Sequence, residues 1–440
     1  MNLCLIQEMK EHIINFIESK KEEAAALSTA IFEHPEVAGH EVFSSDALCQ
    51  FLKNNGFAIE KGLGSQATAF RASYGTEGLC IGFLAEYDAL DGLQQSPQPK
   101  RDGNGGPGHG CGHNLLGVGS CMAAAALKEA LVKSGIPGRI VVYGTPAEET
   151  LYGKTCLRKE GFFKDLDVAL TWHPGAFTCA GELRHKAMHS VVFSFQGRTA
   201  HASVCPEKGR SALDACEVLN IGANYLREHV PEDVRIHYAY KNSSIPPNVV
   251  PDKAAVWYFL RANHRVVADD VLQRMMDAAR GAALICGVQS QCEVLASSDH
   301  TRINTVLARC AYSNMQEIGM PRFDEKDYRF AQSLAEAAGI PEMTGEIDHT
   351  ITPLTGGPVQ EHGSTDFSEV SQVLPALEMF AVCYPKGTPG HHWTTTACAG
   401  SAMAHKGLLF AAKVLACTAL DCITIPGLYE EVRRAFENTD

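Results

Sequence analysis

Four short apolar runs alternate with helical patterns along the chain. They cover residues 79–85, 139–144, 168–172 and 377–384. Short continuous apolar runs between helices are typical of buried strands in a largely parallel sheet. Polar residues that can bind metal follow each run, and the carboxyl ends of strands are where open α/β sheets hold their sites. The pattern predicts an α/β fold with a mostly parallel central sheet, flanking helices and one shared site at the strand ends.

Helical periodicity frames these runs. We expect one helix over residues 6–32, a buried alanine-rich helix over 115–131 and a last helix over 404–420. Another helix should end near Asn54, with Ser44 or Ser45 as its cap. No apolar run is expected to reach the length of a membrane span.

The pattern changes near residue 187. Alternating and helical stretches then follow one another as strand 189–196, helix 211–229, strands 235–241 and 254–261, helix 269–286 and strand 291–296. This β-α-β-β-α-β order is sufficient for a small α+β domain. We therefore expect residues 187–300 to be inserted into a first domain made of residues 1–186 and 301–440.

Composition narrows the class of protein. A chain of 440 residues is long for one core, which favours two domains. The net charge of -13 argues against nucleic acid as a partner, because phosphate binding needs a basic surface. Sixteen cysteines without a Cys-x-x-Cys motif, and an N-terminus without the layout of a signal peptide, favour a reduced cytoplasmic compartment.

The stretch 108–114 concentrates metal-binding chemistry. His109, Cys111 and His113 lie within five residues, separated by glycines. Thiolate and imidazole are preferred ligands of zinc and similar metals, and glycine allows turns that bring neighbouring side chains together. The alternative is a glycine-rich turn with incidental side chains.

Five residues past strand ends or in this stretch supply three imidazoles, one thiolate and one carboxylate: Cys111, His113, Glu149, His173 and His391. Five ligands are too many for one structural zinc, which takes four. Two metal ions a few ångströms apart would share them better, with a hydroxide between. Of the paired Glu148 and Glu149, one can bind metal while the other acts as general base. The alternative for this pair is a solvated turn.

Residues 153–155 (Gly-Lys-Thr) resemble the end of a phosphate-binding loop. Position 148, where the first glycine of that motif is required, is Glu. We therefore discard this interpretation.

The motifs together resemble a known family. The matching segments are 108–114, 146–149, 173–174, 197–202 and Asn248. They are similar to the amidohydrolase branch of the dinuclear-metal aminoacylase and carboxypeptidase family, over nearly the whole chain and most weakly at 301–350. The resemblance implies a zinc-exopeptidase-like metal-binding domain with an inserted lid and dimerisation domain.

The resemblance also implies roles for single residues, matched by motif. Cys111, His113, Glu149, His173 and His391 are the metal ligands, Glu148 is the base, Asp88 orients the metal site from behind, His201 reaches in from the inserted domain, and Asn248 and Arg261 contact substrate. A histidine that donates to the oxyanion would supply what the five ligands lack.

The implied activity is hydrolysis of the amide bond of N-acyl amino acids by a metal-bound hydroxide. Aromatic acyl groups such as p-aminobenzoyl on glutamate are expected, with two Zn²⁺ or Mn²⁺ ions as cofactors. We expect no membrane partner and a homodimer, and leave open a second, paralogous subunit. The alternatives are a dipeptidase of the same family, a non-catalytic partner subunit with a relic site, and a zinc-stabilised binding module.

The chain departs from the family's commoner pattern at three places. Asn114 stands where Asp is usual, and Thr150 where Gly is often found. Residues 391–393 are His-His-Trp where His-Ser-Pro is often found. The first and third departures leave substrate specificity open. The third also leaves the last ligand open between His391 and His392, with His391 favoured.

Overall fold

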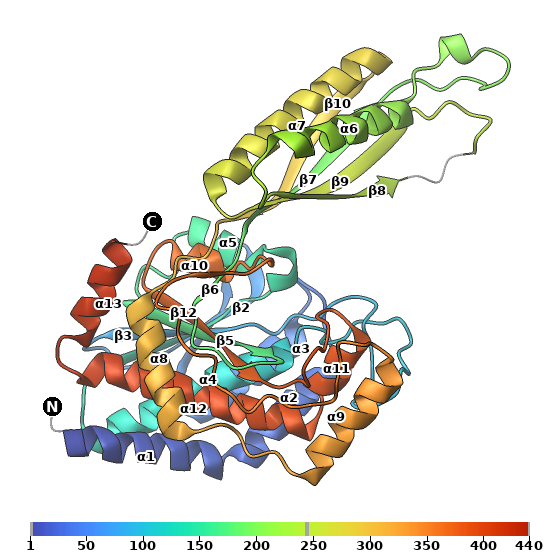
Figure 1. Ribbon diagram of the computed structural model, residues 1–440. Coiled ribbons are helices and arrows are strands. Elements are labelled where there is room, and N and C mark those ends of the chain that lie inside the picture. Colours follow the sequence, from blue (N-terminus) through green and yellow to red (C-terminus); the bar gives the residue numbers. More distant parts are fainter. Residues whose placement is uncertain (1–2, 243–245, 439–440) are drawn as a thin grey trace. The chain divides into compact units, whose positions relative to one another are not determined.

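Contacts within the chain divide it into two units (Figure 1). The computed structural model describes residues 3–242 and 246–438. Unit 1 comprises Met1–Leu183, Arg302–Val359 and Val370–Asp440, and unit 2 comprises Arg184–Thr301 and Gln360–Glu369.

Unit 1 is built on a six-stranded sheet with the order β1-β2-β4-β3-β5-β12. Its strands are β1 (Ala58–Leu63), β2 (Gln66–Tyr74), β3 (Cys80–Ala85), β4 (Arg139–Gly144), β5 (Val168–Gly175) and β12 (Ala376–Val382). The last four are mutually parallel and correspond to the four apolar runs. The predicted α/β class with a mostly parallel sheet is therefore confirmed.

The antiparallel strands β1 and β2 were not predicted. Strand β1 lies at the edge of the sheet, and most of its residues are exposed or half-buried. An exposed edge strand with charged side chains lacks the apolar run that identified the buried strands.

Two long helices, α4 (His113–Ser134) and α12 (Ala402–Thr424), pack against the sheet and against each other. Both are long and apolar enough to cross a membrane, so the expectation that no run reaches that length was wrong. Most of each helix is buried inside unit 1. Gly119 allows the close approach of α4 to β5, because a Cβ there would lie 2.6 Å from Trp172 Nε1.

The helix expected over residues 6–32 is two helices, α1 (Leu3–Ser19) and α2 (Lys21–Glu33), which meet at Lys20. Helix α3 (Val42–Asn54) ends where expected. It begins before Ser44, so neither Ser44 nor Ser45 is its cap; Ser44 instead donates a hydrogen bond to Glu36.

The shorter helices of the remaining chain are α5 (Gly153–Lys159), α8 (Thr305–Ile318), α9 (Glu325–Ala338), α10 (Phe367–Ser371), α11 (Trp393–Ala399) and α13 (Leu428–Glu437). Helix α10 spans the boundary between the two units. The others belong to unit 1.

Unit 2 has the predicted β-α-β-β-α-β order: β7 (Ala187–Gln196), α6 (Ala212–Leu226), β8 (Arg235–Asn242), β9 (Lys253–Ala262), α7 (Arg265–Cys286) and β10 (Gln289–Ser298). The four strands form an antiparallel sheet with the order β10-β7-β9-β8, and α6 and α7 lie side by side on one face of it (Figure 1). Ser211 caps α6 by accepting from Asp214 N.

The segment Gln360–Glu369 was assigned to the first domain from the sequence, but its contacts place it in unit 2. Lys186 N donates to Gly363 O at 2.9 Å, and Arg261 Nη1 donates to Ser364 Oγ at 2.8 Å. The short strands β6 (Leu183–Arg184) and β11 (Val359–Gln360) pair where the chain passes between the units. Two residues are too few for a recognisable strand pattern.

Candidate metal centre and active site

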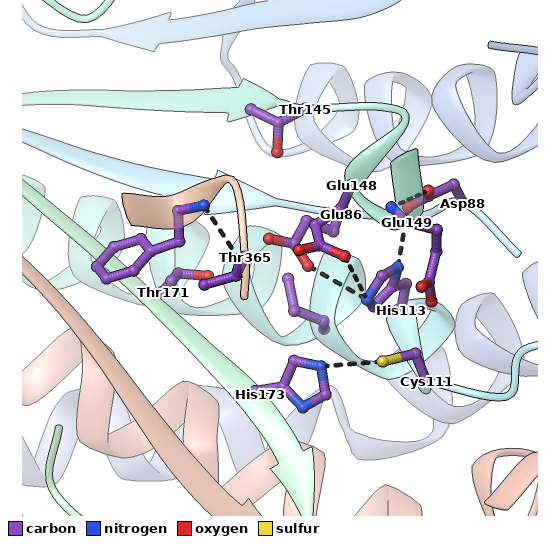
Figure 2. Close-up of polar contacts among 12 residues, drawn as sticks. Glu86, Asp88, Cys111, His113, Thr145, Glu148, Glu149, Thr171, His173 and Thr365 are labelled. Carbon is purple, nitrogen blue, oxygen red and sulfur yellow. Dashed lines mark hydrogen bonds and ion pairs between the residues drawn. The ribbon is translucent and has the colours of Figure 1, made fainter. Parts of the chain in front are cut away.

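The candidate ligands of the metal site converge at the carboxyl ends of the unit 1 strands (Figure 2). Ligand atoms of Cys111, His113 and His173 lie within 4.8 Å of one another, and so do those of Cys111, Glu149 and His391. Cys111 belongs to both groups. The arrangement has the form of two adjacent ligand sets that share one thiol.

The loop before α4 places Cys111 and His113. Gly112 adopts φ +79° between them, and a Cβ there would lie 2.7 Å from Pro174 Cγ. Only glycine fits such a turn without strain. His173 lies on β5, where its Nδ1–H donates to Pro174 O at 2.8 Å and its Nε2 lies 3.3 Å from Cys111 Sγ.

Asp88 orients His113 from behind. The His113 Nδ1–H donates to Asp88 Oδ1 at 2.9 Å, and both side chains are fully buried. The other Asp88 oxygen accepts from Glu149 N at 3.0 Å. Burial by itself would raise the pKa of Asp88, but the hydrogen bond and charge of His113 bring that pKa below its usual value. The His113 ring is left with Nε2 facing the cluster.

Glu148 and Glu149 lie on a strained turn after β4. Ala147 and Leu151, which flank it, have φ +58° and +56°, a left-handed conformation that costs non-glycine residues energy. Thr150 Oγ1 donates to Ala147 O at 3.1 Å and closes the turn, which gives this departure from the family pattern a structural role. Burial raises the pKa of Glu149 to about 7.

His391 and His392 have different environments. His391 Nε2 lies 3.4 Å from Glu149 Oε2, and φ of +52° turns its backbone into the left-handed region. His392 caps α11 by accepting from Thr394 N, and its Nδ1 lies 2.8 Å from Thr394 Oγ1. The geometry therefore favours His391 as the candidate ligand.

The sequence analysis missed a buried ion pair beside the cluster. Glu86 Oε2 lies 3.3 Å from His113 Nε2, and Glu86 Oε1 lies 2.7 Å from Lys154 Nζ. Both side chains are at most 2% exposed, so the two charges compensate each other in a dry environment. The position of Glu86 directly past β3 was the available indication, whereas Lys154 was considered only as part of a phosphate loop.

Asn114 has a structural explanation. Its Nδ2 donates to Ser28 Oγ at 3.0 Å and to Ala399 O at 2.9 Å. An ionised carboxylate only accepts hydrogen bonds, so Asp at this position could not make these contacts. The change from the family's Asp therefore stabilises helix packing.

The three candidates in unit 2 lie at two places. His201 and Asn248 are exposed neighbours, joined by a hydrogen bond from Ala202 N to Asn248 O at 3.0 Å. Arg261 lies eight residues beyond Lys253 along β9, about 26 Å at ~3.3 Å per residue. Arg261 and Asn248 therefore cannot bind the same carboxylate group within one chain.

Arg261 is a guanidinium without an acidic partner in the described part of the chain. Its Nη1 donates to the Ser364 hydroxyl, and burial lowers its pKa. A half-buried charge of this kind is unusual unless it is paired. The side chain is therefore available to an anionic ligand.

The ligand set fits divalent metal ions. His113 Nε2 and Glu149 Oε1 are buried and have no hydrogen-bond partner among the described residues. Buried polar atoms normally have partners, and a mixture of imidazole, thiolate and carboxylate suits zinc and neighbouring metals.

Comparisons with known proteins agree with this site. The Peptidase dimerisation domain model matches residues 183–284. The chain is 34% identical over 456 residues to one of the subunits of p-aminobenzoyl-glutamate hydrolase from Escherichia coli (strain K12), covering 98% of this chain and 95% of that protein. It is 31% identical over 448 residues to Xaa-Arg dipeptidase of Mus musculus, covering 98% and 93%. A dinuclear metal binding peptidase from the M20 family of Bacillus subtilis has the same fold, with a TM-score of 0.61, 15% identity and coverage of 92% and 99%.

The buried pair Lys154–Glu86 yields a stability prediction. Lys154→Met should lower the free energy of unfolding of the metal-free protein by about 3–5 kcal/mol, because it leaves the buried Glu86 carboxylate uncompensated. Adding Glu86→Gln should recover much of the loss. Urea-induced unfolding followed by circular dichroism measures both variants.

The matched control is Lys61→Met, which breaks the exposed ion pair with Asp46. Such a pair contributes about 1 kcal/mol or less. Equal losses for the Lys61 and Lys154 variants would contradict the compensation argument.

Proposed function

The chain belongs to the M20 peptidase family, and on that premise we propose that it hydrolyses the amide bond of N-acyl amino acids, with p-aminobenzoyl-glutamate or a related aromatic acyl-amino acid as substrate. The observation that carries the proposal is the pair of ligand groups sharing Cys111, beside the paired Glu148 and Glu149. The likeness to a p-aminobenzoyl-glutamate hydrolase supports the choice of acyl group.

Two divalent ions, Zn²⁺ or Mn²⁺, would be held by these groups. Cys111, His113 and His173 would hold one, and Cys111, Glu149 and His391 the other. Bound ions of this kind lower the pKa of water and polarise a carbonyl oxygen. Asp88 would fix the His113 ring in the tautomer that leaves Nε2 free to bind.

Glu148 is the proposed general base. It stands next to the ligand Glu149, and its side chain is largely buried. A carboxylate in this position would accept a proton from the attacking water and pass it to the nitrogen of the leaving amino acid. The pairing gives one glutamate the role of ligand and its neighbour the role of proton carrier.

Arg261 is the proposed contact for the free carboxylate of the substrate. A guanidinium matches a carboxylate through two parallel hydrogen bonds, and Arg261 has no acidic partner in the part of the chain that the structure describes. Asn248 would contact a different part of the substrate, since it lies at the far end of β9.

His201 is the proposed donor to the oxyanion, supplied by a second copy of the chain. Within one unit 2 it lies beside Asn248 and far along the sheet from Arg261. A homodimer in which unit 2 of one copy serves the metal centre of another would let both residues reach one substrate. The matched Peptidase dimerisation domain supports dimer formation. The Escherichia coli relative is named as one of several subunits of its hydrolase, which keeps a paralogous chain as an alternative partner.

A dipeptidase activity is the second candidate. It is favoured by the likeness to Xaa-Arg dipeptidase over nearly the whole chain. The same residues would serve both reactions, because both cleave an amide bond beside a free carboxylate.

The first prediction separates the two glutamates. Glu148→Gln should keep both metal ions and lose at least about a hundredfold in kcat, because proton transfer contributes roughly that much. Glu149→Gln should lose metal as well as activity. Metal content by mass spectrometry and kcat measured on p-aminobenzoyl-glutamate test this, and loss of metal from the Glu148 variant alone would reverse the assignment.

The second prediction concerns the substrate carboxylate. Hydrolysis of N-acyl amino acids should be at least about tenfold faster in kcat/KM than hydrolysis of their C-terminal amides, because the amide loses a charge-assisted hydrogen bond. Arg261→Met should remove this preference. A panel of p-aminobenzoyl-amino acids, dipeptides and their amides measures it. Equal rates with and without the carboxylate would count against the role of Arg261, and a preference for dipeptides would establish the second candidate.

The third prediction concerns His201. His201→Ala should keep both metal ions and the fold but lose about 3 kcal/mol of transition-state stabilisation, a typical contribution of one oxyanion donor. Mixing this variant with Glu148→Gln should restore part of the activity, since a mixed dimer would hold one intact site. No recovery from dimers shown to have exchanged their chains would rule out action between copies.

A further inference from the structure

Glu41 is a buried carboxylate far from the metal centre in sequence but joined to it by a hydrogen bond. Its Oε1 accepts from Ala147 N at 2.9 Å and from Gly39 N at 2.9 Å. Its Oε2 accepts from Thr68 Oγ1 at 2.9 Å. The side chain is 0% exposed, so these contacts are made without competition from water.

Ala147, which donates one of these bonds, is the strained residue that precedes Glu148 and Glu149. Its φ of +58° and ψ of +37° are left-handed, which costs an alanine about 1–2 kcal/mol. Strain of this kind persists only where neighbouring contacts over-determine the backbone. Ala147 O also accepts from Tyr152 N at 3.2 Å and from Thr150 Oγ1 at 3.1 Å.

A second carboxylate acts on the same turn from the other side. Asp88 Oδ2 accepts from Glu149 N at 3.0 Å. The peptide N–H before Glu148 and the peptide N–H after it are therefore each held by a buried carboxylate, from Glu41 and Asp88. Asp88 also orients His113, whereas the partners of Glu41 are two backbone N–H groups and the Thr68 hydroxyl.

We infer that Glu41 is a positioning residue: its carboxylate holds the Ala147 N–H and thereby fixes the left-handed turn that presents Glu148 and Glu149 to the metal centre. The inference rests on the proposed function, because it assigns Glu148 and Glu149 their roles there. The hydrogen bonds of Glu41 reach no candidate metal ligand directly, so its effect on the reaction passes through the turn.

The test compares four proteins with the wild type: Glu41→Ala, Glu41→Gln, Glu41→Ala combined with Ala147→Gly, and Asp421→Ala. Glu41→Ala should lower kcat by about tenfold to a hundredfold with little change in KM, because a small displacement of catalytic groups has effects of this size. Glu41→Gln keeps an acceptor oxygen for Ala147 N and should lose less. The added Ala147→Gly should restore much of the lost kcat, since glycine adopts the left-handed conformation without strain.

The second readout is the visible spectrum of the protein loaded with Co²⁺, which responds to ligand geometry without any turnover. It should change in Glu41→Ala and return towards the wild type when Ala147→Gly is added. Asp421 is the matched control: it is a buried carboxylate of unit 1 whose partners include Lys10 and Asn314. Asp421→Ala should lower the melting temperature and leave the spectrum and kcat unchanged.

An unchanged kcat and Co²⁺ spectrum in Glu41→Ala would overturn the inference, and so would a loss that Ala147→Gly does not relieve. Wild-type protein that binds Co²⁺ but cleaves no N-acyl amino acid would overturn the proposed activity, and the spectra alone would then decide the role of Glu41. Wild-type protein that binds no Co²⁺ would overturn both.

Discussion

Repulsion among buried acidic side chains at one end of the unit 1 sheet is the constraint on which the rest of the molecule depends. Glu86, Asp88, Glu148 and Glu149 all lie there, and each is largely removed from water. Like charges in a medium of low dielectric raise one another's pKa and destabilise the fold. Lys154 and the His113 ring offset part of this repulsion, and divalent cations would offset the remainder. The centre is therefore a region where stability has been exchanged for affinity for cations.

The parts of this arrangement that follow from local pattern could be predicted from the sequence. The strands β3, β4, β5 and β12 are continuous apolar runs, and the rule that sites lie past their carboxyl ends was enough to bring Cys111, Glu149 and His173 together. The period of hydrophobic residues encodes burial within an element. It does not encode which distant residue will lie opposite.

The features that escaped prediction all depend on such distant pairings. Glu41 and Ala147 are 106 residues apart, and nothing near Glu41 indicates a role in the turn after β4. The pairing of Glu86 with Lys154 and the placement of segment 360–369 with unit 2 are of the same kind. Local chemistry could name both His391 and His392 as candidates, but their backbone conformations separate them.

The candidate ligands differ in how firmly the fold holds them. His113 is the first residue of a buried 22-residue helix and is itself 0% exposed, whereas the His391 side chain is 57% exposed and lies in a loop. One half of the proposed centre is therefore stiff and the other compliant. A compliant half can follow the tetrahedral preference of zinc or the higher coordination numbers of manganese with little cost to the core. Selectivity between these metals would then be set by their availability in the cell rather than by the shape of the protein.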